Sequence, residues 1–259
     1  MMHPMIYCNG DSYSDPNFHV SLNNSTYAHV VGDHLRGYTM NRAIRGSCNR
    51  RIVRTTVHDM IQQRQLNPDQ KTIALIGLSF EIRSELWIND RQPVISEESN
   101  FVTHAFSSQD NWREKLLQGL SMGELPIPHC GLPTDQLGKK FHKKYTDGRA
   151  YFYSPYAERI NLFCDLIMLR SLLDRLDIDF LIFNAVIPEK LESEYLLGVF
   201  QEEILADPRF IDLDNFGFCN WCNQKGFVPM DYLDRPTIGH YQVDAHRAFA
   251  EEILLPKIK

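Results

Sequence analysis

No apolar run in this 259-residue sequence approaches the length of a membrane-spanning helix. The N-terminus also lacks the basic stretch followed by an apolar segment that marks a secretory signal peptide. We therefore expect a protein without a membrane span and without a signal peptide, working in the cytoplasm.

Basic residues are fewer than acidic residues, with 27 Lys and Arg against 33 Asp and Glu. The sequence contains no visible internal repeat. The formal net charge is -6, which argues against non-specific binding to nucleic acid as the main task. The hydrophobic content of 43% and the charged content of 23% are ordinary for a globular chain. A chain of this length can bury a full core, either as one large domain or as two small ones.

Cysteines in a metal-binding arrangement are also scarce, although the sequence has six of them. Cys219 and Cys222 have the spacing of half a zinc knuckle, and the other half requires a second tight Cys/His pair. Only His129 and Cys130 lie close enough in the sequence, and they are adjacent rather than spaced. We expect no metal or organic cofactor, and free thiols in a reducing compartment.

Short apolar runs alternate with amphipathic stretches along most of the chain. The runs predict strands at residues 5–8, 38–40, 72–76, 180–184 and 210–213. The amphipathic stretches predict helices at about 25–35, 52–61, 160–176, 195–204 and 242–255. This alternation predicts an α/β protein, a three-layer α/β/α sandwich around a flavodoxin-like parallel sheet of five strands.

Residues 86–150 interrupt this rhythm. Aromatic and polar residues mix there without a clear period, prolines and glycines recur, and one helix is expected near residues 112–120. An insertion after a strand lies at the carboxyl edge of the sheet, where it can cover a crevice. We therefore expect one domain over residues 1–259, with a cap-like insertion at about 86–150.

A serine directly follows the first predicted strand, in Gly10-Asp11-Ser12. Open α/β folds place their ligands at the carboxyl edge of the sheet, and Gly10 permits the sharp turn that directs Ser12 into that crevice. Taken alone, this sequence is also ordinary turn chemistry. Whether this turn carries a functional serine is therefore judged from the other loops at the same edge of the sheet.

Three further blocks accompany this serine, and together they resemble the SGNH (GDSL-type) hydrolases. Gly10-Asp11-Ser12-Tyr13 matches the first block, in which the serine is the nucleophile. The loop at residues 41–49 is similar to the second block, whose glycine, here Gly46, donates a backbone N–H to the oxyanion hole. Residues 240–246 resemble the last block, in which the first histidine is the base. The resemblance therefore selects His240 over His246, which we expect to pack or cap in the last helix.

The third block departs from the family pattern of Gly-x-Asn-Asp. Here Ser79 takes the place of the asparagine that donates to the oxyanion. A hydroxyl can donate as well, but it is shorter, and a purely structural role for Ser79 is an open alternative. Arg83 is a candidate for assisting there or for binding an acidic substrate group, with a plain ion pair to Glu85 as the alternative. Gly46 could likewise be only a loop glycine.

The acid of the expected triad is the second departure. The family places it three residues before the histidine, where this sequence has Thr237. Asp231 and Asp234 lie further upstream. We select Asp234, because the proline and glycine that follow it can bend the loop toward His240. A Ser-His dyad, or a backbone carbonyl that orients the ring, is the alternative.

The resemblance implies a serine esterase that cleaves O-acetyl groups of carbohydrates or small acyl esters. The wording of the third block is also similar to SGNH-like proteins of bacteriophages, which implies a phage origin and association with a virion as a second location. Both departures favour an alternative function, a catalytically weak or inactive protein that keeps the fold for binding or structure. The sequence does not indicate an oligomeric state.

Overall fold

The computed structural model describes residues 3–17, 22, 25–80, 84–86, 125–127, 155–188, 195–231 and 239–258. The expected cap lies almost entirely outside these residues, as do Arg83, Asp234 and Thr237. The cap and the role of Arg83 therefore stay predictions.

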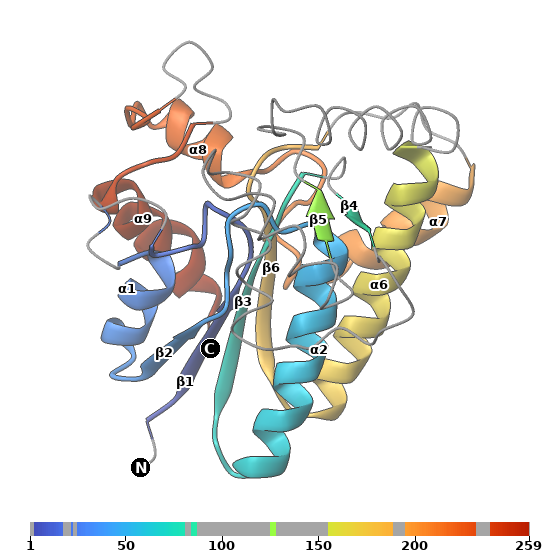
Figure 1. Ribbon diagram of the computed structural model, residues 1–259, viewed down its shortest axis with the longest axis horizontal. Coiled ribbons are helices and arrows are strands. Elements are labelled where there is room, and N and C mark those ends of the chain that lie inside the picture. Colours follow the sequence, from blue (N-terminus) through green and yellow to red (C-terminus); the bar gives the residue numbers. More distant parts are fainter. Residues whose placement is uncertain are drawn as a thin grey trace.

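The main sheet consists of four parallel strands in the order β2-β1-β3-β6 (Figure 1). They are β1 (Met5–Asn9), β2 (Tyr38–Asn41), β3 (Thr72–Leu78) and β6 (Asp179–Asn184). The helix α1 (Tyr27–His34) connects β1 to β2, α2 (Asn49–Leu66) connects β2 to β3, and α6 (Pro155–Arg175) leads into β6. Parallel strands with helical connections bring all four carboxyl ends to one edge of the sheet.

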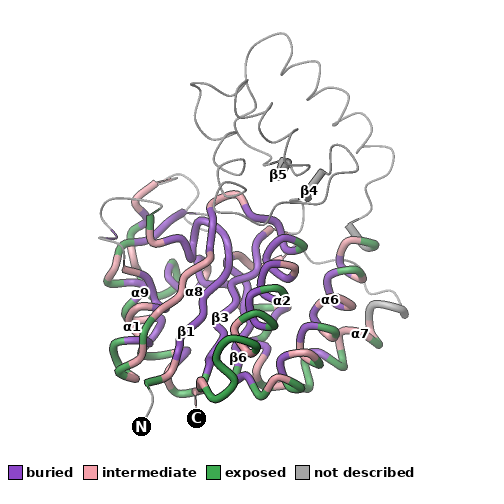
Figure 2. Tube along the Cα trace, turned by 60° about the horizontal axis from the view of Figure 1, so that its bottom comes forward, coloured by how far each residue is buried: buried purple, intermediate pink, exposed green. Residues whose placement is uncertain are grey.

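Helices cover both faces of this sheet, as expected for an α/β fold. In Figure 1, α1 and α9 (Val243–Phe249) lie on one face, whereas α2, α6 and α7 (Tyr195–Leu205) lie on the other. Every residue of β1 and β3 is buried, and Figure 2 shows these strands in purple. Because both faces are covered, the strands read as continuous apolar runs rather than as alternating patterns.

Two apolar cores result from the alternation of side chains along the strands. Ile6 and Cys8 face the core on the side of α1 and α9. Met5 and Tyr7 face the core on the side of α2 and α6. The first strand thus belongs to both cores, which fixes the position of the turn that follows it.

The predicted fifth strand, at residues 210–213, is wrong. Phe210 forms only an isolated parallel bridge with Ile182, so the sheet has four strands among the described residues. Asp212 has a φ of 34°, and this left-handed residue ends the extended path immediately after the bridge. The apolar pattern reflects burial of Phe210, Ile211 and Leu213 rather than a paired strand.

The remaining described elements are short. β4 (Ser84–Leu86) pairs antiparallel with β5 (Leu125–Ile127) in a separate two-stranded sheet. α8 (Phe218–Gln224) is a helix that the sequence did not predict, and α9 continues into a π-helical turn at Ala250–Leu254 and a 3₁₀ turn at Leu255–Lys257. Within the described ranges, the structure has no helix both long enough and apolar enough to span a membrane.

Candidate active site

The turn after β1 carries the serine at the carboxyl edge of the sheet. The amides of Ser14 and Asp15 both donate to the carbonyl of Asp11, at 3.0 and 3.1 Å, so the chain closes a tight turn around Ser12. Ser12 is buried, with 6% of its surface exposed. Its neighbourhood therefore determines its reactivity more than bulk water does.

A continuous line of hydrogen bonds connects Ser12, His240 and Asp231. The Oγ of Ser12 lies 2.8 Å from Nε2 of His240, and Nδ1 of His240 lies 2.7 Å from Oδ2 of Asp231. The backbone amide of His240 also donates to Oδ1 of Asp231, at 2.7 Å. When Nδ1–H donates to the carboxylate, Nε2 is left free to accept the hydroxyl proton of the serine.

The charge of Asp231 suits this position. Burial opposes ionisation of the carboxyl group, but the hydrogen bonds from the imidazole and the amide of His240 outweigh it. They hold the pKa of Asp231 below its ordinary value. Asp231 therefore stays ionised at neutral pH, and it can stabilise a positive charge on the adjacent ring.

We expected Asp234 to contact the imidazole of His240. The residue that makes this contact is Asp231, which lies nine residues before the histidine. Asp234 itself lies outside the described residues. The chain returns on itself here, since the amide of Met230 donates to the carbonyl of His240 at 2.7 Å. A Cβ on Gly239 would lie 2.4 Å from Cβ of Pro229, so the two segments approach too closely for a side chain. Gly239 was the one sequence signal of this close approach.

The second loop runs beside the serine turn. The amide of Arg42 donates to the carbonyl of Cys8 at 2.7 Å, and the amide of Ile44 donates to the carbonyl of Gly10 at 3.1 Å. Gly46 follows with a φ of 81°, a conformation that favours glycine. The predicted oxyanion loop is therefore attached to the end of β1, next to Ser12.

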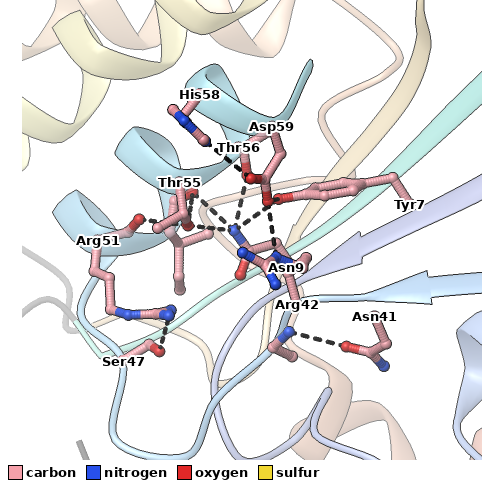
Figure 3. Close-up of polar contacts among 12 residues, drawn as sticks. Tyr7, Asn9, Asn41, Arg42, Ser47, Arg51, Thr55, Thr56, His58 and Asp59 are labelled. Carbon is pink, nitrogen blue, oxygen red and sulfur yellow. Dashed lines mark hydrogen bonds and ion pairs between the residues drawn. The ribbon is translucent and has the colours of Figure 1, made fainter. Parts of the chain in front are cut away.

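A buried polar cluster behind this loop fixes it in place (Figure 3). Asp59 on α2 accepts hydrogen bonds from Tyr7 Oη at 2.9 Å and from Arg42 Nε at 3.1 Å. Asn9 Nδ2 donates to Thr55 Oγ1 at 2.7 Å. These contacts join β1, the loop and α2, so the backbone around the site is held by paired polar groups.

The hydroxyl of Ser79, which we expected to donate to the oxyanion, makes a different contact. Its hydroxyl donates to Oδ2 of Asp11 at 2.7 Å. Its backbone amide donates to Asn49 Oδ1 at 2.7 Å, and its carbonyl accepts from Asn49 Nδ2 at 3.1 Å. The single hydroxyl hydrogen cannot serve Asp11 and an oxyanion at the same time. The geometry favours the structural alternative, in which Ser79 supports the turn that carries Ser12.

His246 lies in α9, away from the line of contacts between Ser12 and Asp231. It is buried and packs against Phe218, at a ring-centroid distance of 4.9 Å, and against Tyr27. Burial lowers its pKa to about 3, and the nearby imidazoles of His240 and His29 lower it further when they carry a proton. A histidine in this setting stays neutral and acts as a packing residue.

Metal-ligating side chains do not gather anywhere in the described part of the chain. No group of three or more His, Cys, Asp or Glu residues there could hold an ion. The five described cysteines are free thiols.

The chain matches no family model and no curated protein. Among solved structures, it is similar to a protein of Parabacteroides merdae described as a "putative GDSL-like lipase". The two chains share 12% identity over 96% of this chain and 93% of that one, with a TM-score of 0.38. A likeness at this level supports no conclusion about function, and a phage origin stays a prediction. The case for a function rests on the residues of the site.

Proposed function

We propose that this protein is a serine hydrolase of the SGNH type that cleaves ester bonds. The observation that carries the proposal is the continuous contact from Ser12 through His240 to Asp231. A hydroxyl is a poor nucleophile until an adjacent base removes its proton, and an oriented imidazole is that base.

The reaction follows from the positions of these groups. Ser12 Oγ attacks the ester carbonyl while His240 Nε2 takes its proton, and Asp231 stabilises the imidazolium. The tetrahedral intermediate collapses as His240 returns the proton to the leaving alcohol, which yields an acyl-serine and a free alcohol. Water then attacks the acyl group with His240 again as base, and the carboxylic acid and Ser12 are released.

The oxyanion is held by two backbone donors in this proposal, the amides of Ser12 and Gly46. Ser79 adds no third donor while its hydroxyl is committed to Asp11. The absence of one donor raises the barrier by about 3 kcal/mol in comparable sites. We therefore infer an esterase that is slower than one with a full set of donors.

The substrate class is the finer part of the proposal. O-acetylated carbohydrates and small acyl esters are the substrates that the resemblance implies. The chemistry of the site is consistent with any accessible ester, because it acts on the carbonyl group and the leaving oxygen. Acetylated xylan and p-nitrophenyl acetate are suitable test substrates of the two kinds.

Hydrolysis of p-nitrophenyl acetate by matched serine variants tests the proposal. Ser12→Ala should abolish turnover and leave the thermal midpoint nearly unchanged. Ser171→Ala is the control, since Ser171 is an exposed residue of α6 whose hydroxyl donates to the carbonyl of Ile167 in the same helix. It should retain full activity. Retained turnover in Ser12→Ala would refute the assignment of Ser12, whereas a wild-type protein without turnover would favour the non-catalytic alternative.

A further inference from the structure

The residue after the serine, Tyr13, lies against the histidine. The ring centroids of Tyr13 and His240 are 4.5 Å apart, and the ring planes differ by 18°, so the two rings are stacked. Both residues are buried, at 5% and 8% exposure. One face of the imidazole is therefore covered by an aromatic ring that belongs to the nucleophile turn itself.

Tyr13 is held at both ends. Its backbone amide donates to Oδ1 of Asp11 at 3.1 Å. Its hydroxyl forms a hydrogen bond with the thiol of Cys219 on α8, and that thiol contacts the carbonyl of Gly239 at 3.5 Å. Gly239 directly precedes His240. Tyr13 thus connects the turn that carries the serine with the loop that carries the histidine.

The hydrogen bonds of the imidazole leave one motion weakly restrained. Nε2 contacts Ser12 and Nδ1 contacts Asp231, and the two contacts lie on opposite sides of the ring. A small rotation about the Cβ–Cγ bond moves both nitrogens mainly perpendicular to the ring plane, so both distances change little. A stacked aromatic ring opposes this rotation, because any tilt drives the imidazole edge into the tyrosine face.

The same stack acts on the charge that develops during catalysis. The face of an aromatic ring carries a partial negative potential, which attracts a cation placed over it. The imidazole becomes a cation when it takes the serine proton. The Tyr13 ring is therefore placed to stabilise the state in which His240 is charged, together with Asp231.

We propose that Tyr13 is a positioning residue for the His240 base, and that it acts by fixing the tilt of the imidazole and by favouring the imidazolium. This inference rests on the proposed function, since it assumes that His240 takes a proton from Ser12. It assigns a role to a residue at which the matching family block has another side chain, leucine in the GDSL wording.

The kinetic test compares two substitutions of Tyr13. Tyr13→Phe keeps the stacked ring and removes only the hydroxyl, whereas Tyr13→Leu removes the ring and keeps an apolar side chain. Tyr13→Leu should lower kcat for p-nitrophenyl acetate by about two- to five-fold with KM unchanged, because the ring acts on the transition state. Tyr13→Phe, which loses only the hydrogen bond to Cys219, should lower kcat less than Tyr13→Leu does. Wild-type turnover in Tyr13→Leu, or an equal loss in both variants, would overturn the proposal.

A second readout does not depend on activity. Protons over the face of an aromatic ring are shielded, so the carbon-bound ring protons of His240 should resonate upfield in proton NMR spectra. Loss of these signals in His240→Gln assigns them. They should keep their positions in Tyr13→Phe and move downfield in Tyr13→Leu, and unchanged positions in Tyr13→Leu would contradict the stack.

The two readouts also separate the possible failures. An inactive wild-type protein with shielded His240 protons would refute the proposed function and leave the stacking intact. An active protein in which Tyr13→Leu matches the wild type would refute only the role of Tyr13. If Tyr13→Leu does not fold, Tyr13→Met replaces it, because an unbranched side chain fills an irregular gap more readily.

Discussion

Asp231 binds His240 at two points, since one carboxylate oxygen contacts Nδ1 of the ring and the other accepts the backbone amide, each at 2.7 Å. The pair of contacts connects Nδ1 of the ring to the backbone of the same residue through one carboxylate. It also favours the tautomer in which Nδ1 carries the proton and Nε2 accepts from Ser12. In the proposed mechanism Asp231 is therefore the acid that orients the base, although the position three residues before the histidine holds a threonine.

Asp231→Asn should lower the turnover of p-nitrophenyl acetate by about 10⁴-fold, because an amide at this position favours the wrong tautomer and cannot stabilise the imidazolium. The thermal midpoint should change little, since the side chains have similar shape. Asp234→Asn is the matched control and should retain wild-type turnover. If instead Asp234→Asn is the damaging substitution, the acid has been misassigned.

Ser79→Ala should destabilise the protein by about 1.5–3 kcal/mol, because the buried carboxylate of Asp11 loses a hydrogen bond. Denaturant unfolding monitored by circular dichroism measures this difference. An oxyanion donor at position 79 would behave differently, with a 10²–10³-fold loss of turnover and an unchanged unfolding free energy. That second pattern would restore the role expected from the sequence.

Tyr7→Phe should also destabilise the protein, by about 1.5–3 kcal/mol, since it removes a hydrogen bond to the buried carboxylate of Asp59. Chemical denaturation again provides the measurement. Tyr38→Phe is the control. Tyr38 is an exposed residue of the edge strand β2, so the loss of its hydroxyl should leave the stability unchanged. Equal stability of the two variants would mean that the polar cluster does not hold β1 and α2 together.

The buried imidazole of His246 predicts a loss of stability in acid. Its pKa is about 3 in the folded protein, compared with 6.5 for an ordinary histidine. Between these values the unfolded chain binds a proton that the folded protein does not. The stabilisation present at neutral pH is therefore lost as the pH falls below about 6.5, by up to 1.4 kcal/mol per pH unit.

Comparison with His246→Phe isolates this contribution from those of the carboxylates. The free energy of unfolding, measured between pH 4 and pH 7, should fall less steeply in the variant than in the wild type. The absolute stability of the variant is not the test, because the change of ring shape alters packing as well. Parallel curves would show that His246 takes up its proton in both states equally.

The sheet was predictable where burial alone determines the pattern. β1 and β3 are covered on both faces, so their continuous apolar runs indicated strands at the right places. The segment with Phe210 and Ile211 has the same appearance for another reason, since it is buried without being paired beyond one bridge. Periodicity cannot distinguish these cases, because the turn at Asp212 depends on a backbone conformation.

The site was predictable for those residues that lie in loops directly after a strand. Ser12 and Gly46 lie where the carboxyl edge of a parallel sheet requires, and the last helix begins just after His240. The partner of His240 was not predictable from spacing, because contacts between residues 229–231 and residues 239–240 bring Asp231 to the ring. The stack of Tyr13 has the same origin in contacts between distant segments.

Reaction with a fluorophosphonate tests the central claim most directly, because it needs no knowledge of the natural substrate. The serine oxygen bonds to phosphorus, fluoride leaves, and the hydroxyl proton passes to the base. Mass spectrometry of the digested protein should find one adduct, on Ser12, and both His240→Ala and Asp231→Asn should slow its formation. An unlabelled wild-type protein, or an adduct on any other serine, would contradict the assignment of Ser12 as an activated nucleophile.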